Sequence, residues 1–96
     1  MATVSYWSGS WASAGPDDDL QPGEEHDWIM WGFDISAAIS ITVQPVVGNP
    51  FADRVLQVEN IQSEGATSGR RIFYTVRNAG PDTVIGYLIN FGFISG

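Results

Sequence analysis

The 96-residue sequence contains no cysteine and no lysine. Without cysteine the chain forms no disulfide, zinc–thiolate site or iron–sulfur cluster, and without lysine it forms no Schiff base. No apolar run approaches the ~20 residues that span a bilayer, and residues 1–5 lack the basic start and apolar core of a signal peptide. We therefore expect one soluble domain over residues 1–96, either cytoplasmic or extracellular after processing or leaderless export.

Basic side chains are scarce, because four arginines stand against eleven carboxylates and give a net charge of −7. Binding a phosphate backbone needs a basic surface, so we expect no nucleic-acid partner, and the same charge disfavours anionic lipid. Residues 1–53 carry eight carboxylates and no arginine, whereas residues 54–96 carry three carboxylates and all four arginines. This asymmetry can orient neighbouring copies of the chain or another protein partner.

Strand patterns run through the whole sequence, and no segment shows a helical stripe over ten or more residues. The plainest pattern is a pair of runs, residues 71–77 and 83–94, which flank turn-forming residues and predict a long antiparallel hairpin. The remaining predicted strands cover residues 1–8, 26–33, 36–44 and 54–62, and the predicted loops cover residues 12–23 and 63–69. A break of parity at Ile61 indicates a bulge or a strand end. Together these elements predict an antiparallel β-sandwich, immunoglobulin-like, with a small open β-barrel as the alternative.

Two short turn patterns carry a family resemblance. Leu20-Gln21-Pro22-Gly23-Glu24 is similar to the L-x-P-G-E entry into a strand, and Val76-Arg77-Asn78-Ala79-Gly80 is similar to the V-x-N-x-G corner, of bacterial immunoglobulin-like modules of the CARDB and related adhesion-associated kind. The resemblance covers about ten residues. It implies a sandwich fold and a binding or spacer role without catalysis, and it supplies no site residues.

The segment 26–33 is apolar on both faces of its predicted strand. Trp28 and Met30 would face one way, and Ile29, Trp31 and Phe33 the other. We expect the core to cover one face, and either the long loop or another subunit to cover the second. A monomer would leave an aromatic patch exposed, which soluble monomers seldom tolerate, so the segment predicts a homo-oligomer.

The candidate binding residues are aromatic. Tryptophan is frequent in the first third of the chain, and exposed tryptophan faces stack on sugars and partner proteins; the four candidates are Trp7, Trp11, Trp28 and Trp31. The alternatives are packing in the core or a subunit interface, and a platform for a glycan. Glycines within strands mark close approaches, so we expect Trp28 or Trp31 to pack over Gly86 or Gly92.

The candidate metal ligands are acidic. Calcium takes six to eight oxygen ligands, which a carboxylate-rich loop can supply, and the candidates here are Asp17, Asp18, Asp19 and Glu24. Their spacing matches no EF-hand, so the alternative is a solvated loop. His26 stands beside Glu25 and Asp27, but no G-x-S-x-G nucleophile motif accompanies it. We expect a surface histidine and no enzymatic activity.

Three functions remain open from the sequence. The first is a non-catalytic structural or protein-interaction module that self-associates, as the two-faced strand indicates. The second is a carbohydrate-binding, lectin-like module that uses the clustered tryptophans and the acidic, calcium-binding loop. The third is a membrane-active or toxin-like protein, since clustered tryptophan suits a membrane interface, although the surrounding carboxylates oppose anionic lipid.

Overall fold

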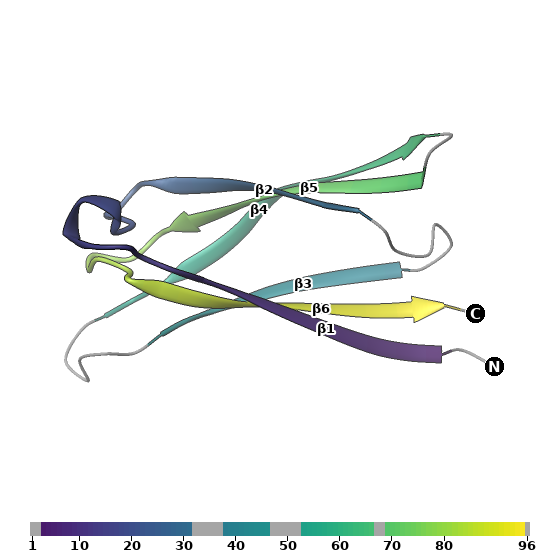
Figure 1. Cartoon of the computed structure of the whole chain (residues 1–96), viewed down its shortest axis with the longest axis horizontal. Coiled ribbons are helices and arrows are strands. Elements are labelled where there is room, and N and C mark those ends of the chain that lie inside the picture. The colour runs from purple at the N-terminus through teal and green to yellow at the C-terminus, as the bar shows by residue number, and fades with distance from the viewer. Residues whose placement is uncertain (1–2, 32–37, 47–52, 67–68, 96) are drawn as a thin grey trace.

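The computed structural model describes residues 3–31, 38–46, 53–66 and 69–95. They form six strands and one short 3₁₀ helix, in the order β1 (Thr3–Ala12), η1 (Pro16–Asp18), β2 (Glu25–Trp31), β3 (Ala38–Pro45), β4 (Leu56–Ala66), β5 (Gly69–Asn78) and β6 (Gly86–Ser95). The strands are packed as two layers (Figure 1). The predicted antiparallel β-sandwich is thereby confirmed.

Each layer is a three-stranded antiparallel sheet. One sheet has the order β1-β6-β3 and the other has the order β2-β5-β4, so β6 and β5 are the central strands. The two sheets face each other as separate layers instead of closing into the barrel that was the alternative. In β3 the alternation of the sequence matches burial, because Ile39, Ile41 and Val43 are half-buried while Ser40 and Thr42 are exposed.

The strand order follows from the winding of a single ribbon. The first strand pairs with the last and the second pairs with the fifth, while β3 and β4 approach each other along one side of the sandwich. When this ribbon curls, β3 pairs with β6, which gives a jelly-roll winding with six strands. In immunoglobulin constant domains the sheets are A-B-E-D and C-F-G. Strand order thus gives the immunoglobulin-like part of the prediction no support, and the family resemblance stays a prediction.

The predicted hairpin of residues 71–77 and 83–94 is wrong. Its two arms belong to β5 and β6, which lie in different sheets, so residues 79–85 connect the two layers. The arms face each other through the core instead of sharing hydrogen bonds, as the edge-to-face contact of Tyr74 with Phe91 shows at 5.7 Å between ring centroids. Each arm is the central strand of its sheet, and its two hydrogen-bonded neighbours are other strands of the chain. The sequence of the two arms alone does not reveal those neighbours.

The hairpin between neighbouring strands is β4 with β5. The predicted loop over residues 63–69 is therefore wrong over its described part, because β4 continues to Ala66; residues 67–68 lie outside the described residues. The predicted break near Ile61 is confirmed as a bulge, since the register shifts between Glu59 and Gln62. Asn60 adopts a positive φ of 55° at this point, which twists the edge of the sheet.

Strand β1 is longer than predicted, because it runs through residues 8–10 to Ala12. Gly9 continues the strand and leaves room for an aromatic ring. A Cβ atom at Gly9 would lie 3.0 Å from Cη2 of Trp7, so the ring would have to shift to admit a methyl group. The Trp7 ring thus lies along the inner face of its own strand, over Gly9.

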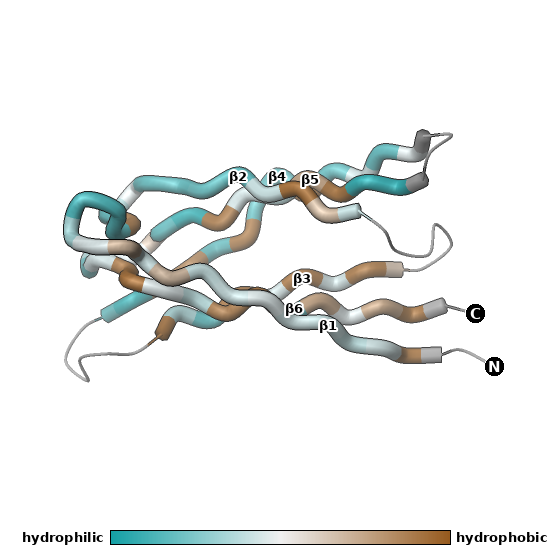
Figure 2. Tube along the Cα trace, viewed as in Figure 1, coloured by the Kyte–Doolittle hydropathy of each residue, from teal (hydrophilic) through white to brown (hydrophobic). Residues whose placement is uncertain are grey.

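The core fills the space between the central strands. Its buried members come from β5, β6, the connection before β2 and the connection before β6; they are Leu20, Ile72, Tyr74, Val76, Val84, Tyr87, Ile89 and Phe91. Ile72, Tyr74 and Val76 of β5 all point inward, as the alternation within residues 71–77 indicates. Apolar segments alternate with less apolar ones along β3 and β6 (Figure 2), as expected for a sheet with one face in the core.

Candidate functional site

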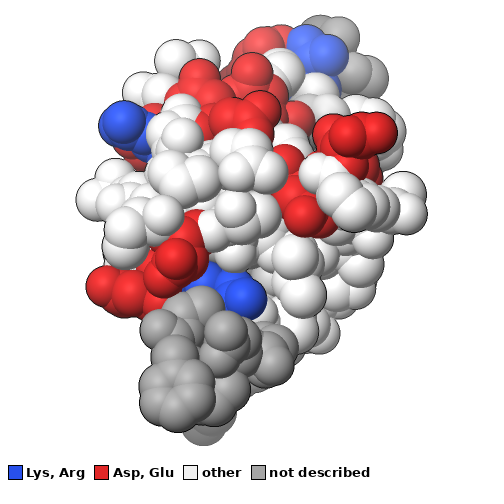
Figure 3. All heavy atoms as spheres, turned by 90° about the vertical axis from the view of Figure 1, so that its left-hand side faces the viewer, with Lys and Arg blue, Asp and Glu red and all other residues white. Residues whose placement is uncertain are grey.

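Charge is distributed between the two sheets very unevenly. None of the residues of β1, β3 or β6 is charged, whereas β2, β4 and β5 carry charged residues on every strand. The other carboxylates of the described residues lie in the connections, and those of the loops 13–24, 53–55 and 78–84 gather at one end of the sandwich (Figure 3). The folded chain therefore has a charged sheet, an acidic end and an uncharged sheet, and this division does not follow the two halves of the sequence.

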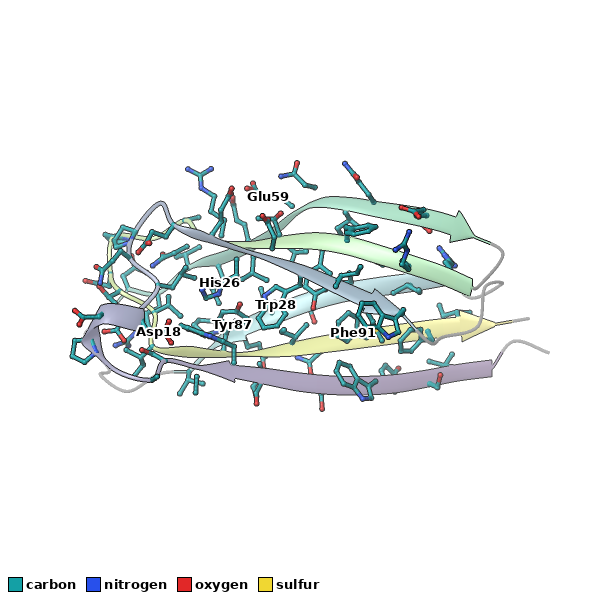
Figure 4. All side chains as sticks on the ribbon, turned by 45° about the horizontal axis from the view of Figure 1, so that its top comes forward. Asp18, His26, Trp28, Glu59, Tyr87 and Phe91 are labelled. Carbon is teal, nitrogen blue, oxygen red and sulfur yellow. The ribbon has the colours of Figure 1, made fainter. Side chains whose placement is uncertain are left out.

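A cluster of aromatic side chains centred on Tyr87 lies between the two layers, near the acidic end (Figure 4). The phenolic oxygen of Tyr87 accepts a hydrogen bond from Nε1 of Trp28 at 2.8 Å, and it lies 2.8 Å from Nδ1 of His26. The Trp11 ring packs against both neighbours, at 4.5 Å from His26 and 5.2 Å from Tyr87 between ring centroids. Strands β1, β2 and β6 thus meet in one polar–aromatic cluster.

The hydroxyl group of Tyr87 serves both neighbours. Trp28 Nε1 can only donate, so the Tyr87 oxygen accepts there, and its contact with Nδ1 of His26 is a second hydrogen bond whose direction is set by the histidine tautomer. Desolvation by burial raises the pKa of Tyr87 to about 12, although the Trp28 hydrogen bond opposes this shift. His26 is half-buried and engaged, so the prediction of a surface histidine is wrong.

The four candidate tryptophans separate into two pairs. Trp11 and Trp28 are half-buried in the Tyr87 cluster, and they contribute to the core. Trp7 is 53% exposed, although its ring packs on Phe91 at 5.1 Å, and Trp31 is 63% exposed. The predicted packing of tryptophan over strand glycines is wrong for Trp28 and Trp31, because Gly92 lies beside Ser40 and Tyr6, and Gly86 beside the backbone of Trp11 and Ala12.

Strand β2 has the two faces that its sequence predicted. Trp28 and Met30 pack on the core, while Ile29 and Trp31 point outward and are exposed. Ile29 pairs with Phe73 of β5, and Arg71 lies over the Phe73 ring at 5.8 Å and forms an ion pair with Glu64. Within the described residues no loop covers this outer face; Phe33 lies outside the described residues.

The acidic candidates shape the loop that holds them. Asp19 accepts a hydrogen bond from the Ser13 hydroxyl at 2.5 Å, and Asp18 accepts one from the Ala14 amide at 3.1 Å. Glu24 accepts one from the Gln21 amide at 2.8 Å, and Asp17 lies in η1 and is exposed. Across the described part of the chain, no three acidic or histidine side chains come together as metal ligands. The calcium hypothesis therefore gains no support, and the predicted site stays a prediction.

A shallow groove on the outer face of the uncharged sheet was not predicted. It has a volume of about 380 Å³, and its lining comes from all three strands: Tyr6, Trp7, Ser8, Ser40, Thr42, Asn90, Phe91 and Gly92. Gly92 forms its floor, since a Cβ atom there would lie 2.7 Å from the Ser40 hydroxyl oxygen. Tyr6 is 82% exposed beside this floor. The groove therefore offers one aromatic face surrounded by neutral hydroxyl and amide groups.

Sequence reasoning missed Tyr6, Tyr87 and Asn78. An inward tyrosine must find a partner for its hydroxyl group, and that rule applied to Tyr87 would have drawn attention to His26 and Trp28. Asn78 is fully buried, and its place in a turn pattern hid this role. Tyr6 gives no signal in the sequence, because its importance comes from its position beside Gly92, 86 residues along the chain.

The fold and this surface define a small all-β sandwich with one uncharged sheet. The chain matches no protein-family model, no curated protein and no solved structure. Across its described residues, no helix is both long enough and apolar enough to cross a membrane.

Proposed function

We propose that this chain is a non-catalytic interaction module that associates with itself through the uncharged β1-β6-β3 sheet. One observation carries the proposal: a complete sheet has no charged residue in a chain of net charge −7. Outward-facing strand positions in water are usually polar and often charged, whereas charged residues are depleted in the centres of protein interfaces. The residue types of this sheet are thus those of a contact surface.

Exposed apolar side chains on the same sheet support the proposal. Val4 and Tyr6 on β1 point outward, as do Leu88 and Ile94 on β6, and all four are exposed. The hydroxyl and amide side chains between them are short and uncharged, so two copies can approach without burying a charge. The sequence has one histidine, His26, and it is engaged with Tyr87 inside the sandwich, so no imidazole accompanies the serine and threonine hydroxyl groups of this surface.

Sedimentation velocity across micromolar concentrations, at low and high salt, tests self-association. We expect a reversible dimer that is as stable or more stable at high salt, because salt screens the repulsion between two acidic molecules and leaves an uncharged contact intact. A chain that stays monomeric at every concentration and both salt conditions would contradict the proposal. An association that weakens with salt would place the contact on the charged sheet instead.

A second candidate function is binding of a neutral saccharide in the outer groove. The Tyr6 ring supplies a stacking face, and Ser8, Ser40, Thr42 and Asn90 supply hydrogen-bonding groups without charge. A glycan array probed with the wild-type chain and with Tyr6→Ala, each with and without chelator, tests it. Binding that needs Tyr6 and ignores the chelator supports this groove. Binding that needs calcium supports the acidic loop, and the absence of any binding removes the lectin hypothesis.

A further inference from the structure

The contact between copies can be placed more closely than on a whole sheet. Resting on the proposed self-association, we propose that two copies meet along the free edge of β1, where each β1 pairs antiparallel with β1 of the second copy. The two β1-β6-β3 sheets then continue into one sheet across the molecular two-fold axis. The inference depends on which backbone groups of β1 are unpaired, on the absence of protection at this edge, and on the fit of the strand to itself.

A hydrogen bond just after the end of β1 shows which residues of this strand bond to β6 and which face the free edge. The amide of Ser13 donates to the carbonyl oxygen of Ile85 at 2.8 Å, in the same register that pairs Trp11 with Tyr87. In an antiparallel pair the hydrogen-bonded residues alternate, so odd-numbered residues of β1 bond to β6. The even-numbered residues direct their amide and carbonyl groups to the free edge; they are Val4, Tyr6, Ser8, Ser10 and Ala12.

The phase of the neighbouring strand agrees with this assignment. The amide of Val46 donates to the carbonyl oxygen of Gly86 at 2.9 Å, so even-numbered residues of β6 bond to β3 and leave the odd-numbered ones for β1. The free groups of β1 belong to residues whose side chains lie on the outer face of the sheet, and these side chains are exposed. The edge is therefore open to another strand.

Edge strands in soluble proteins are usually protected by charges, prolines or bulges, and β1 has none of these protections. It contains neither a charged residue nor a proline over ten residues. Strand β2 carries Glu25 and Asp27, and β4 carries the bulge at Asn60 together with Glu59 and Glu64. Strand β3 lies against β4 along the closed side of the sandwich. Of the strands described here, β1 alone presents a long unprotected edge.

A second copy of this chain is the partner that best fits the edge. Two molecules of net charge −7 repel each other wherever their carboxylates meet, but they can approach along β1 without bringing charges together. When Ser8 lies opposite Ser8 of the second copy, all five outward-directed residues find partners: Val4 faces Ala12, and Tyr6 faces Ser10. A shift of this register leaves some of these groups unpaired.

The same register places Trp7 opposite Gly9 of the second copy. Trp7 is half-exposed because it lies at the open side of the sandwich, on the inner face of β1. Each Trp7 ring already lies over Gly9 of its own strand, so this register brings the two Trp7 rings side by side next to the two-fold axis. The pairing therefore covers the Trp7 ring as well as the free backbone groups, and burial of such a ring adds favourable hydrophobic contact.

Introducing a charge of either sign at residue 8, on the proposed two-fold axis, tests the register directly. Ser8→Lys and Ser8→Glu each place two like charges opposite each other, so we expect each variant alone to dimerise about tenfold more weakly than the wild type. An equimolar mixture of the two variants pairs opposite charges, and we expect it to recover the wild-type affinity. If residue 8 does not face residue 8 of the second copy, the two substitutions change the dimer affinity in opposite directions. The mixture then does not recover the wild-type affinity.

Three further variants complete the experiment. Ser8→Pro removes an edge amide without removing a bond to β6, and we expect it to abolish the dimer. Thr42→Lys places a charge on the outer face of the same sheet but away from the β1 edge. Trp31→Ser changes the exposed apolar patch of Ile29 and Trp31 on the other sheet. We expect both variants to dimerise as the wild type does. Circular dichroism and thermal melting confirm the fold of each.

The outcomes separate the inference from the proposed function. A wild type that stays monomeric contradicts the self-association itself. If the wild type dimerises and the Ser8 variants leave the dimer intact, only the placement of the contact at the β1 edge is overturned. Dissociation by Thr42→Lys would then place the contact on the outer face of the uncharged sheet, and dissociation by Trp31→Ser would place it on the patch of β2. A weakened dimer in both single variants with recovery on mixing supports the antiparallel β1 contact.

Discussion

The side-chain amide of Asn78 donates a hydrogen bond to the backbone carbonyl oxygen of Leu20 at 2.9 Å, across 58 residues of sequence. The same amide donates to the carbonyl oxygen of Asp82, and its oxygen accepts from the amide of Gly80. The backbone of Asn78 adds two bonds to the turn of Gly23 and Glu24. The two turn patterns that carry the family resemblance are therefore in contact, and one buried side chain joins them.

Replacing Asn78 tests the strength of this connection. Asn78→Ala removes three side-chain hydrogen bonds: the carbonyl oxygen of Asp82 and the amide of Gly80 lose this partner, while the carbonyl oxygen of Leu20 keeps only its bond from the Val84 amide. Each lost hydrogen bond costs about 1 kcal/mol, and more where a buried group stays unsatisfied. We expect the free energy of unfolding to fall by about 2–4 kcal/mol, measured by urea denaturation. Asn90→Ala, on the outer face of β6, is the matched control and should change stability by less than about 0.5 kcal/mol. Equal effects of the two substitutions would contradict the role of Asn78.

The Tyr87 hydroxyl group is the subject of the second prediction. Tyr87→Phe keeps the ring but leaves Nε1 of Trp28 and Nδ1 of His26 without their shared partner, so we expect a loss of about 1–3 kcal/mol in stability. Tyr6→Phe removes an exposed hydroxyl group and should be nearly neutral. Trp28 fluorescence in the Tyr87→Phe variant should also change, because the indole loses its hydrogen bond. A neutral Tyr87→Phe would show that the cluster is held by ring packing alone.

Alkaline pH should destabilise the fold through two tyrosines. Burial raises the pKa of Tyr74 and of Tyr87 from 10.0 to about 12. The unfolded chain therefore loses these protons first, so stability is independent of them below pH 10 and decreases as pH rises from 10 to 12. The decrease is up to about 2 kcal/mol per group.

The composition makes this measurement unusually clean. With neither lysine nor cysteine in the chain, tyrosine is the only side chain that titrates in this range. Denaturation at successive pH values should show the decrease, and Tyr87→Phe should show about half of it. A stability that stays constant from pH 8 to pH 12 would contradict the assigned shifts.

The last prediction compares two glycines. A Cβ atom at Gly80 would lie 2.8 Å from the backbone nitrogen of Val55 and 3.0 Å from the carbonyl oxygen of Asp53. Because backbone cannot move aside easily, we expect Gly80→Ala to cost about 1–3 kcal/mol. Gly65→Ala on β4 meets no atom within 4 Å, so it should be neutral or slightly stabilising. Thermal melting of the pair checks the difference, and a tolerated Gly80→Ala would contradict this close approach.

The sequence predicted strands well because their patterns are local. The alternation in β3, the inward face of β5 and the bulge near Ile61 all follow from neighbouring residues, and the structure confirms them. The sequence predicted the pairing of strands poorly, since the hydrogen bonds between strands depend on partners far along the chain. The turn after Asn78 is the clearest case: its residues signal a reversal of direction, but a reversal within one sheet and a crossing between sheets use the same residue types.

The candidate site was predictable only in part. The excess of tryptophan and the two-faced strand drew attention to the correct half of the chain, and Trp7 and Trp31 are exposed. The uncharged sheet could not be found in advance, because it combines the first, third and last strands. No local window of sequence contains more than one of them. Similarly, Tyr87 meets His26 and Trp28 only because β6 and β2 belong to opposite layers.

The pairing of β1 with β6 also determines the order in which the molecule can be built. On the ribosome β1 is made first among the strands and β6 last, so β1 has no partner in its own sheet until translation of the domain is nearly finished. The β4–β5 hairpin joins neighbouring segments and can form early, whereas closure of the β1-β6 pair brings together residues as distant as Thr3 and Ser95. Such long-range pairing slows folding. We therefore expect a slow final step, during which the uncharged first strand is fully accessible to chaperones.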